Sequence, residues 1–131
     1  MGKFVYPDKS SYEGAWVEDK RSGEGVYKYA NGDVYKGGWE GDVKAGQGSY
    51  FFKASKSTFM GSWVKGKFTE GEWILKDGTI FKGKFKNNKP LEGSFTFSKN
   101  GNVTTGKFDK HGFFTEDQAS IQEETTAAVA Q

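Results

Sequence analysis

The sequence YEGAW at residues 12–16 decides the fold, because it returns along the chain at nearly equal spacing. It recurs as YKGGW at 35–39, as FMGSW at 59–63, as FKGKF at 81–85 and in a weaker form as TTGKF at 104–108. The first positions of these copies, residues 12, 35, 59, 81 and 104, are 23, 24, 22 and 23 residues apart. A fixed period of this length indicates an array of one small structural unit, each stacked on the next.

A second motif, glycine-x-aromatic, keeps step with the first. It occurs as GVY, GSY, GEW and GSF at residues 25–27, 48–50, 71–73 and 93–95, and an earlier copy, GKF, stands at residues 2–4. Each repeat therefore holds two short segments in which glycine and aromatic residues alternate with other residues. Alternation with a period of two, rich in aromatics and bounded by turn residues, predicts β-strands.

The segments between these strands carry turn sequences. Asn31-Gly32, Asp77-Gly78 and Asn100-Gly101 supply residues that accept a positive φ, and Pro7-Asp8 marks the corresponding corner in the first, partial unit. Each unit is therefore predicted to be a β-hairpin. Consecutive hairpins then continue into one all-β, single-layer, twisted antiparallel meander of about ten short strands.

The glycines are predicted to share one face of this sheet with the aromatic residues. Glycine weakens a strand, but a bare Cα also lets a ring from the neighbouring strand lie across it. A single-layer sheet has no second layer to cover its aromatic face. Twist must hide part of that face, and we expect a partner to cover the rest.

The pattern resembles the MORN repeat (membrane occupation and recognition nexus), whose units read YxGxW…GxGxYx(Y/F)…(D/N)G. On this resemblance, residues 1–113 form a MORN-repeat domain. The full repeats are 12–34, 35–58, 59–80 and 81–103, and the half repeats are 1–11 and 104–113. The resemblance implies stacked MORN hairpins, and it is far more specific for the fold than for the function.

Residues 24–113 are similar to the C-terminal MORN stretch of the radial-spoke-head proteins of motile cilia and flagella. The similarity rests on FKASKSTF at 52–59, GSWVKG at 61–66 and FKGKFKNNKP at 81–90. It implies a non-catalytic scaffold in an axonemal complex with other protein subunits. MORN proteins also serve in basal-body, other cytoskeletal and lipid-kinase settings.

Composition limits the remaining classes of protein. The chain has no cysteine and no apolar run of membrane-spanning length, and its N-terminus lacks the apolar stretch of a secretory signal, so we expect an intracellular location. Lysines and arginines outnumber acids 13 to 5 over residues 44–113, whereas the tail, residues 114–131, has four acids and no base. Thr115 and Gln118 fit a capping box for a short C-terminal capping helix, and an irregular terminus is the alternative.

No group in the sequence indicates catalysis, a metal or a cofactor. His111 is the only histidine, and neither converging carboxylates nor an ordered serine accompanies it in the sequence pattern. The carboxylates are spread along a sheet that offers no deep cleft to shift their pKa values. We therefore expect a protein that is not an enzyme and binds neither cofactor nor metal.

A concave groove on the aromatic face is the predicted partner-binding site. Its expected lining residues are those of the first motif: Tyr12, Trp16, Tyr35, Trp39, Phe59, Trp63, Phe81 and Phe85. Exposed contiguous apolar surface often marks an interaction site. In the alternative interpretation, these rings merely pack on one another and on the glycines.

A row of lysines gives a second candidate surface. Lys82, Lys84, Lys86 and Lys89 lie on one predicted strand and its turn, where they can contact anionic lipid such as a phosphoinositide headgroup. Membrane association through this row is the alternative function, and a solvated face that prevents aggregation of the sheet is the simpler interpretation. We expect no nucleic-acid partner.

Overall fold

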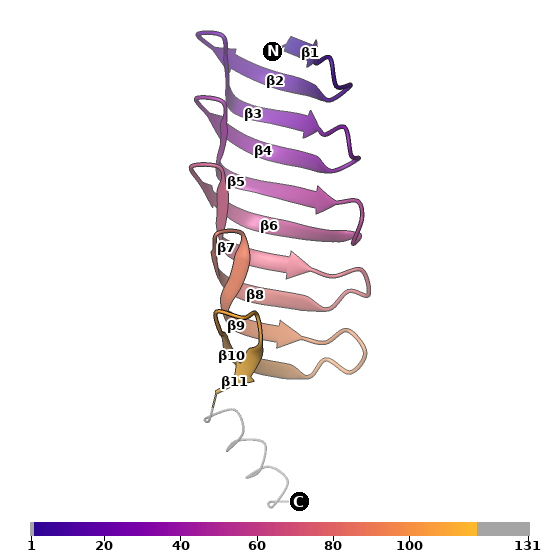
Figure 1. The fold of residues 1–131 in the computed structure, drawn as a ribbon, viewed down its shortest axis with the longest axis vertical. Helices are drawn as coiled ribbons and strands as arrows, with labels where there is room; N and C mark the ends of the chain where they lie inside the picture. The colour runs from indigo at the N-terminus through magenta and orange to yellow at the C-terminus, as the bar shows by residue number, and fades with distance from the viewer. Residues whose placement is uncertain (1, 118–131) are drawn as a thin grey trace, which may run out of the picture.

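The structure of the protein, a computed structural model, describes residues 2–117. All regular structure in this range is β-strand, and eleven strands form one open antiparallel sheet in chain order (Figure 1). The predicted all-β antiparallel meander is thereby confirmed. The strands are β1 (Gly2–Val5), β2 (Ser11–Val17), β3 (Lys20–Lys28), β4 (Val34–Glu40), β5 (Val43–Phe52), β6 (Ser57–Val64), β7 (Lys67–Ile74), β8 (Ile80–Lys86), β9 (Lys89–Thr96), β10 (Val103–Phe108) and β11 (Phe114–Glu116).

The eleventh strand begins where the sequence predicted the acidic tail. In β11, Phe114 faces Phe108 and Glu116 faces Gly106 of β10, so the sheet continues beyond residue 113. Thr115, the expected cap of a C-terminal helix, is a strand residue that faces Lys107. The rest of that predicted helix, from Gln118 onward, lies outside the described residues.

The turn sequences behave as predicted. Gly32, Gly78 and Gly101 have φ values of 96°, 91° and 71°, which favour glycine. At the first two of these turns, the side chains of Asn31 and Asp77 each accept a hydrogen bond of 2.9 Å from the backbone N–H two residues later. Local side-chain bonds of this kind fix the turn and end the preceding strand.

One glycine from each of the first ten strands stands in a row that crosses the sheet. Gly14 of β2 faces Gly25 of β3, and Gly25 also faces Gly37 of β4. A Cβ on Gly14 would lie 2.5 Å from both the Gly25 Cα and the Glu24 carbonyl oxygen, so neighbouring backbones meet here without side chains. The row consists of Gly2, Gly14, Gly25, Gly37, Gly48, Gly61, Gly71, Gly83, Gly93 and Gly106.

Tyrosine rings lie across this glycine row. The Tyr12 ring fills the space that a Cβ on Gly25 would need, and its hydroxyl donates a hydrogen bond of 3.0 Å to the Ala15 carbonyl. Tyr35 repeats the arrangement one unit later, donating to the Gly38 carbonyl at 3.0 Å. The prediction that rings from a neighbouring strand cover the glycines is confirmed.

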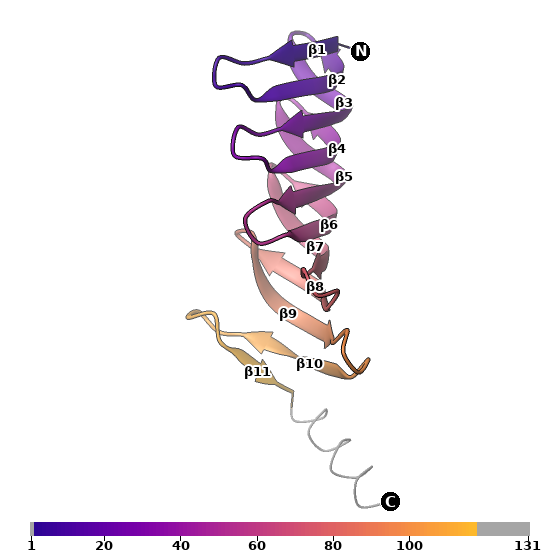
Figure 2. The ribbon, with the colours of Figure 1, turned by 90° about the vertical axis from the view of Figure 1, so that its right-hand side faces the viewer.

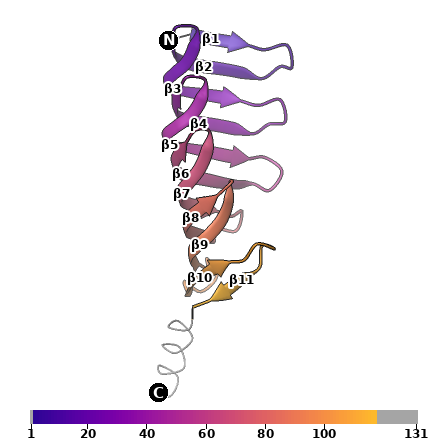
Figure 3. The ribbon, with the colours of Figure 1, turned by 60° about the vertical axis from the view of Figure 1, so that its left-hand side comes forward.

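Each of the first four full hairpins also contains a bulge in its register. An irregular residue on one strand bends that strand and increases its twist. The curved ends of the hairpins consequently stack above one another along one side of the molecule (Figures 2 and 3). The bulges fall between Gly14 and Trp16, Gly37 and Trp39, Ser62 and Trp63, and Lys84 and Phe85.

Rings of successive repeats form a continuous ladder that serves as the core. Tyr12 packs edge-on against Trp16 of its own repeat and against Trp39 of the next, with centroids 5.1 and 5.4 Å apart. Edge-to-face contact is a favourable geometry for aromatic pairs. Edge-on contacts between repeats also join Tyr35 to Trp63 and Phe81 to Phe108, at 5.2 and 5.6 Å, and a tilted contact joins Phe59 to Phe85 at 5.2 Å.

Candidate functional site

Seven of the eight predicted partner-binding residues lie inside this ladder. Tyr12, Tyr35 and Phe81 are fully buried, and Trp39, Phe59, Trp63 and Phe85 expose 7% of their surface or less. Trp16 is half-buried, because it stands at the N-terminal end of the ladder. The burial fits the alternative interpretation, in which these rings hold the repeats together. A partner that binds this face would therefore mainly contact rings outside this set of eight.

Most of the half-buried rings on this face belong to the second motif or stand two residues after it. They lie on or directly after β3, β5, β7 and β9, and they pack side by side; the centroids of Tyr29 and Tyr50 are 5.4 Å apart. The sequence placed them on the correct face but did not assign them to the site. Their distinguishing signal is aromatic-x-aromatic spacing, as in YKY at 27–29 and YFF at 50–52. The half-buried members are Tyr27, Tyr29, Tyr50, Phe52, Trp73 and Phe95.

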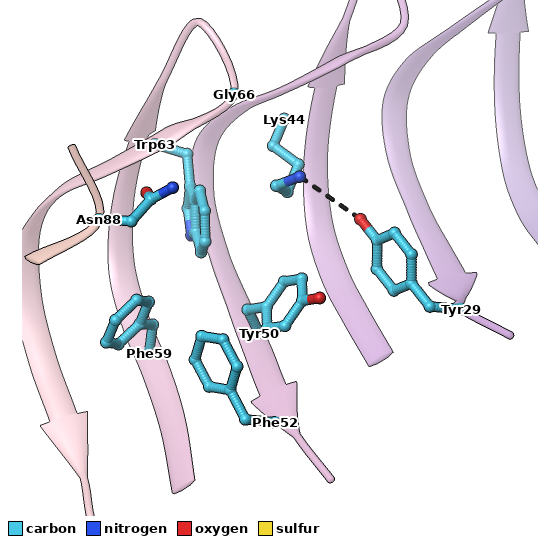
Figure 4. A pocket seen from close by; sticks show the side chains of 8 residues that line it. All are labelled: Tyr29, Lys44, Tyr50, Phe52, Phe59, Trp63, Gly66 and Asn88. Carbon is cyan, nitrogen blue, oxygen red and sulfur yellow. Dashed lines mark hydrogen bonds between the residues drawn. The ribbon is translucent and has the colours of Figure 1, made fainter. Parts of the chain in front are cut away.

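These rings line part of a hollow that we call the aromatic groove. Its first section has a volume of about 300 Å³ and is lined by Tyr29, Lys44, Tyr50, Phe52, Phe59, Trp63, Gly66 and Asn88 (Figure 4). An adjoining section of about 290 Å³ reaches Arg21 and Asp42. Tyr29, Lys44 and Gly66 line both sections, so the two form one continuous groove.

Two cations project over the rings of this groove. Arg21 faces Trp16 across the first hairpin and Lys44 faces Trp39 across the second, which puts both on the aromatic face. The Arg21 guanidinium lies 4.7 Å from the Trp39 ring centroid and 5.1 Å from that of Tyr27, within the range of cation–π attraction. Alternation already puts Arg21 on the face of Gly25 and Lys44 on the face of Gly48, but the sequence pattern does not show that either cation lies over rings of a neighbouring hairpin.

Arg21 is held by an acidic residue from the turn of the next hairpin. The Asp42 carboxylate accepts hydrogen bonds from the Arg21 backbone N–H at 2.8 Å and from Nε at 3.1 Å. The Asp42 backbone N–H donates in return to the Arg21 carbonyl at 3.1 Å. Asn88, in the turn between β8 and β9, makes one similar bond: its side-chain oxygen accepts a hydrogen bond of 2.9 Å from the Phe68 backbone N–H. These bonds stack one hairpin end on the next.

Removing the charge of Asp42 is expected to weaken this stack. The Arg21 backbone N–H, together with the guanidinium, holds the pKa of Asp42 below its usual value. The carboxylate therefore contributes stability above its unfolded pKa of about 4, and this contribution is lost as the pH falls through the lower folded pKa. Because the Asp42 side chain is 42% exposed, we expect Asp42→Asn to cost only about 1 kcal/mol at pH 7.

Urea denaturation of the wild type and Asp42→Asn at pH 7 and pH 2 measures this contribution directly. The difference in unfolding free energy should shrink towards zero at the lower pH. An equal difference at both pH values would contradict the assigned role.

Lys44 occupies the corresponding position, and no acidic residue between residues 2 and 117 forms an ion pair with it. Its Nζ lies 5.7–6.0 Å from five ring centroids and donates one long hydrogen bond, of 3.4 Å, to the Tyr29 hydroxyl. Burial, with the nearby charge of Arg21 second, lowers the pKa of Lys44. Burial likewise raises the pKa of Tyr29 to about 12, so its hydroxyl stays protonated at neutral pH. The rings around Nζ are those of Tyr29, Tyr35, Trp39, Tyr50 and Trp63.

The predicted lysine row lies on the opposite, polar face. Lys82, Lys84, Lys86 and Lys89 are all exposed. Acids of the adjacent strands stand beside two of them: Glu72 faces Lys82, and Glu92 approaches the Lys84 Nζ at 4.0 Å. This alternation of signs weakens the row as an anionic-lipid surface.

The described residues offer few groups for chemistry. Between residues 2 and 117 there is no cluster of three metal-ligating side chains, and no helix in this range is long and apolar enough to cross a membrane. His111 is exposed in the loop before β11, where its backbone N–H donates to Asp109 at 2.8 Å. The predicted absence of catalysis, metals and cofactors stays a prediction.

These features define a single-layer β-repeat protein with an aromatic groove. A sequence model of the MORN repeat matches residues 12–34 and 35–54, so the chain contains MORN repeats in step with the first two predicted copies. None of the curated proteins compared with the chain matches it. MORN repeats are often involved in binding proteins or membranes. The similarity to radial-spoke-head proteins stays a prediction.

Proposed function

We propose that this protein is a non-catalytic scaffold that binds a partner protein in the aromatic groove. The observation that carries the proposal is the row of half-buried rings along a face that no second layer covers within residues 2–117. Interfaces draw most of their binding energy from a few aromatic and arginine anchors, and this groove presents both kinds. Completing the burial of each half-exposed ring would contribute about 1 kcal/mol, roughly half the value for a whole side chain.

The proposal extends to the setting of the complex. On the similarity of residues 24–113 to radial-spoke-head proteins, we place the protein in the axoneme of cilia or flagella, bound to other axonemal subunits. A pull-down from ciliated cell extract, compared with extract of non-ciliated cells, tests this setting. Recovery of the same partners from both extracts would contradict the axonemal setting. It would not contradict the proposal that the groove binds a protein.

Adjacent phenylalanines on β5 provide a matched test of the groove. Phe52 lines it, whereas Phe51, also half-buried, points to the opposite face. We expect Phe52→Ser to weaken partner binding about fivefold, the equivalent of about 1 kcal/mol, because it removes a ring that the partner would bury, and Phe51→Ser to leave binding within a factor of about two. Isothermal titration with the recovered partner gives both values, and circular dichroism verifies that each variant is folded.

The lysine row supplies the second control. Replacing Lys82, Lys84 and Lys86 by glutamate should not change partner affinity, since these residues lie on the polar face. The same triple variant tests membrane association. Salt-sensitive binding of the wild type to phosphatidylserine vesicles, abolished in the variant, would favour a lipid partner over a protein.

A further inference from the structure

We propose that Lys44 and Gly66 form a receptor position for a carboxylate of the bound partner segment. The segment is an extended stretch of another protein, with an aspartate or glutamate at Lys44 and apolar side chains on either side. This inference rests on the proposed function and specifies the chemistry that the groove selects.

The first observation is that Lys44 has no ion-pair partner in the part of the chain that the structure describes. Lys44 Nζ lies among five aromatic rings, and its one hydrogen bond goes to the Tyr29 hydroxyl at 3.4 Å (Figure 4). Within residues 2–117, the two ion pairs are Arg21–Asp42 and Lys84–Glu92, and neither involves Lys44. Removing a cation from water without a paired anion is unfavourable, and an incoming carboxylate would supply that anion.

The second observation comes from comparing the repeats with one another. Asp42 and Gly66 occupy the same turn position, and their backbone N–H groups donate to the carbonyls of Arg21 and Lys44 at 3.1 and 2.9 Å. Their φ values, 72° and 83°, are also alike. The backbone hydrogen bond between hairpin ends is therefore the same in these two repeats, and glycine at position 66 supplies no carboxylate for Lys44 as Asp42 does for Arg21.

The third observation is that the place of this carboxylate is open. A Cβ on Gly66 would meet only the Val43 Cβ, at 3.9 Å, and Gly66 lines both sections of the groove. A carboxylate entering here would accept from Lys44 Nζ. The carboxylate would also accept a hydrogen bond from the Tyr29 hydroxyl. This hydroxyl accepts from Lys44 Nζ, so its own proton is still available for donation.

The rings beside Lys44 fit the rest of the segment. Side chains at alternate positions of an extended chain point the same way and are about 7 Å apart. With an acidic side chain at Lys44, apolar neighbours two residues away would contact Phe52 and Phe59 in one section of the groove and Tyr27 in the other. The expected motif is apolar-x-acidic-x-apolar.

The test uses the full chain and a synthetic decapeptide with one central glutamate flanked at two residues' distance by phenylalanines, together with its glutamine twin. Affinities are measured by NMR titration. We expect the wild type to prefer the glutamate peptide by about tenfold, the value for one buried charge-assisted hydrogen bond. Lys44→Met should abolish the preference. Gly66→Asp should also abolish it by supplying the carboxylate internally, whereas Gly66→Asn, its neutral match, should retain it.

Each outcome decides a different question. Equal binding of both peptides by the wild type, or a preference that survives Lys44→Met, would overturn the carboxylate position and leave the groove standing as a protein site. Binding of neither peptide would contradict the proposed function, and the carboxylate position at Lys44 and Gly66 would be contradicted as well. Carbodiimide coupling of Lys44 to a carboxylate of residues 118–131, or to a second copy of the chain, would assign the groove to that occupant and overturn the choice of another protein.

Discussion

Gly37→Val is expected to destabilise the sheet by about 3 kcal/mol, because two backbones meet at this residue without room for a side chain. A Cβ here would lie 2.6 Å from the Gln47 carbonyl oxygen and 2.9 Å from the Tyr35 hydroxyl. The backbone of the paired strand cannot yield as a flexible side chain can. Urea denaturation followed by tryptophan fluorescence measures the loss.

Gly41→Asn is the matched control for this substitution. Gly41 has no atom within 4 Å of an added Cβ, and its φ of 55° is close to the 52° that Asn87 adopts at the equivalent turn position. We expect a change of less than about 0.5 kcal/mol. Similar losses from both variants would show that flexibility of the chain, and not close approach in the glycine row, explains the glycines.

Tyr35→Ala is expected to cost about 3–5 kcal/mol, the range for removing a large buried aromatic side chain. The Tyr35 ring is fully buried and touches Trp39 and Trp63, so its loss opens a cavity where two repeats meet. Unfolding by urea, monitored through those tryptophans, would report the effect.

Tyr35→Phe separates the ring from its hydroxyl. This substitution removes only the hydrogen bond to the Gly38 carbonyl and should cost about 1 kcal/mol. Phe59 and Phe81 stand at the same repeat position without a hydroxyl and are still buried. A Tyr35→Phe loss as large as that of Tyr35→Ala would assign the stability to the hydrogen bond and contradict the aromatic ladder.

The sequence predicted the fold well because its signals are local. Alternation of YEGAW at 12–16 and GVY at 25–27 decides both strand and face, and turn pairs such as Asn31-Gly32 mark where strands end. The weak motif at 104–108 still forms a strand. The sequence did not predict β11 at residues 114–116, because this segment carries no repeat motif.

The site was predicted less well because depth of burial depends on contacts between repeats. Alternation placed Tyr12 on the aromatic face, but its burial also depends on the ring of Trp39, from the next repeat. Alternation also places Lys44 with Gly48 and Tyr50 on the aromatic face, but it does not show that Nζ lies over the rings of Trp39 and Trp63. A period of two predicts which face a side chain occupies and does not predict its contacts with other strands.

Site-specific photo-crosslinking from the two faces of β5 tests whether the partner binds in the aromatic groove. Benzoylphenylalanine replaces Phe52 in the groove in one protein and Phe51 on the opposite face in another, and each is irradiated with the purified partner. If the partner binds in the groove, position 52 gives a crosslinked product that an excess of unlabelled wild-type protein suppresses, and position 51 gives none. Crosslinking from position 51 alone, or equally from both, would contradict the claim that this protein works through its aromatic groove.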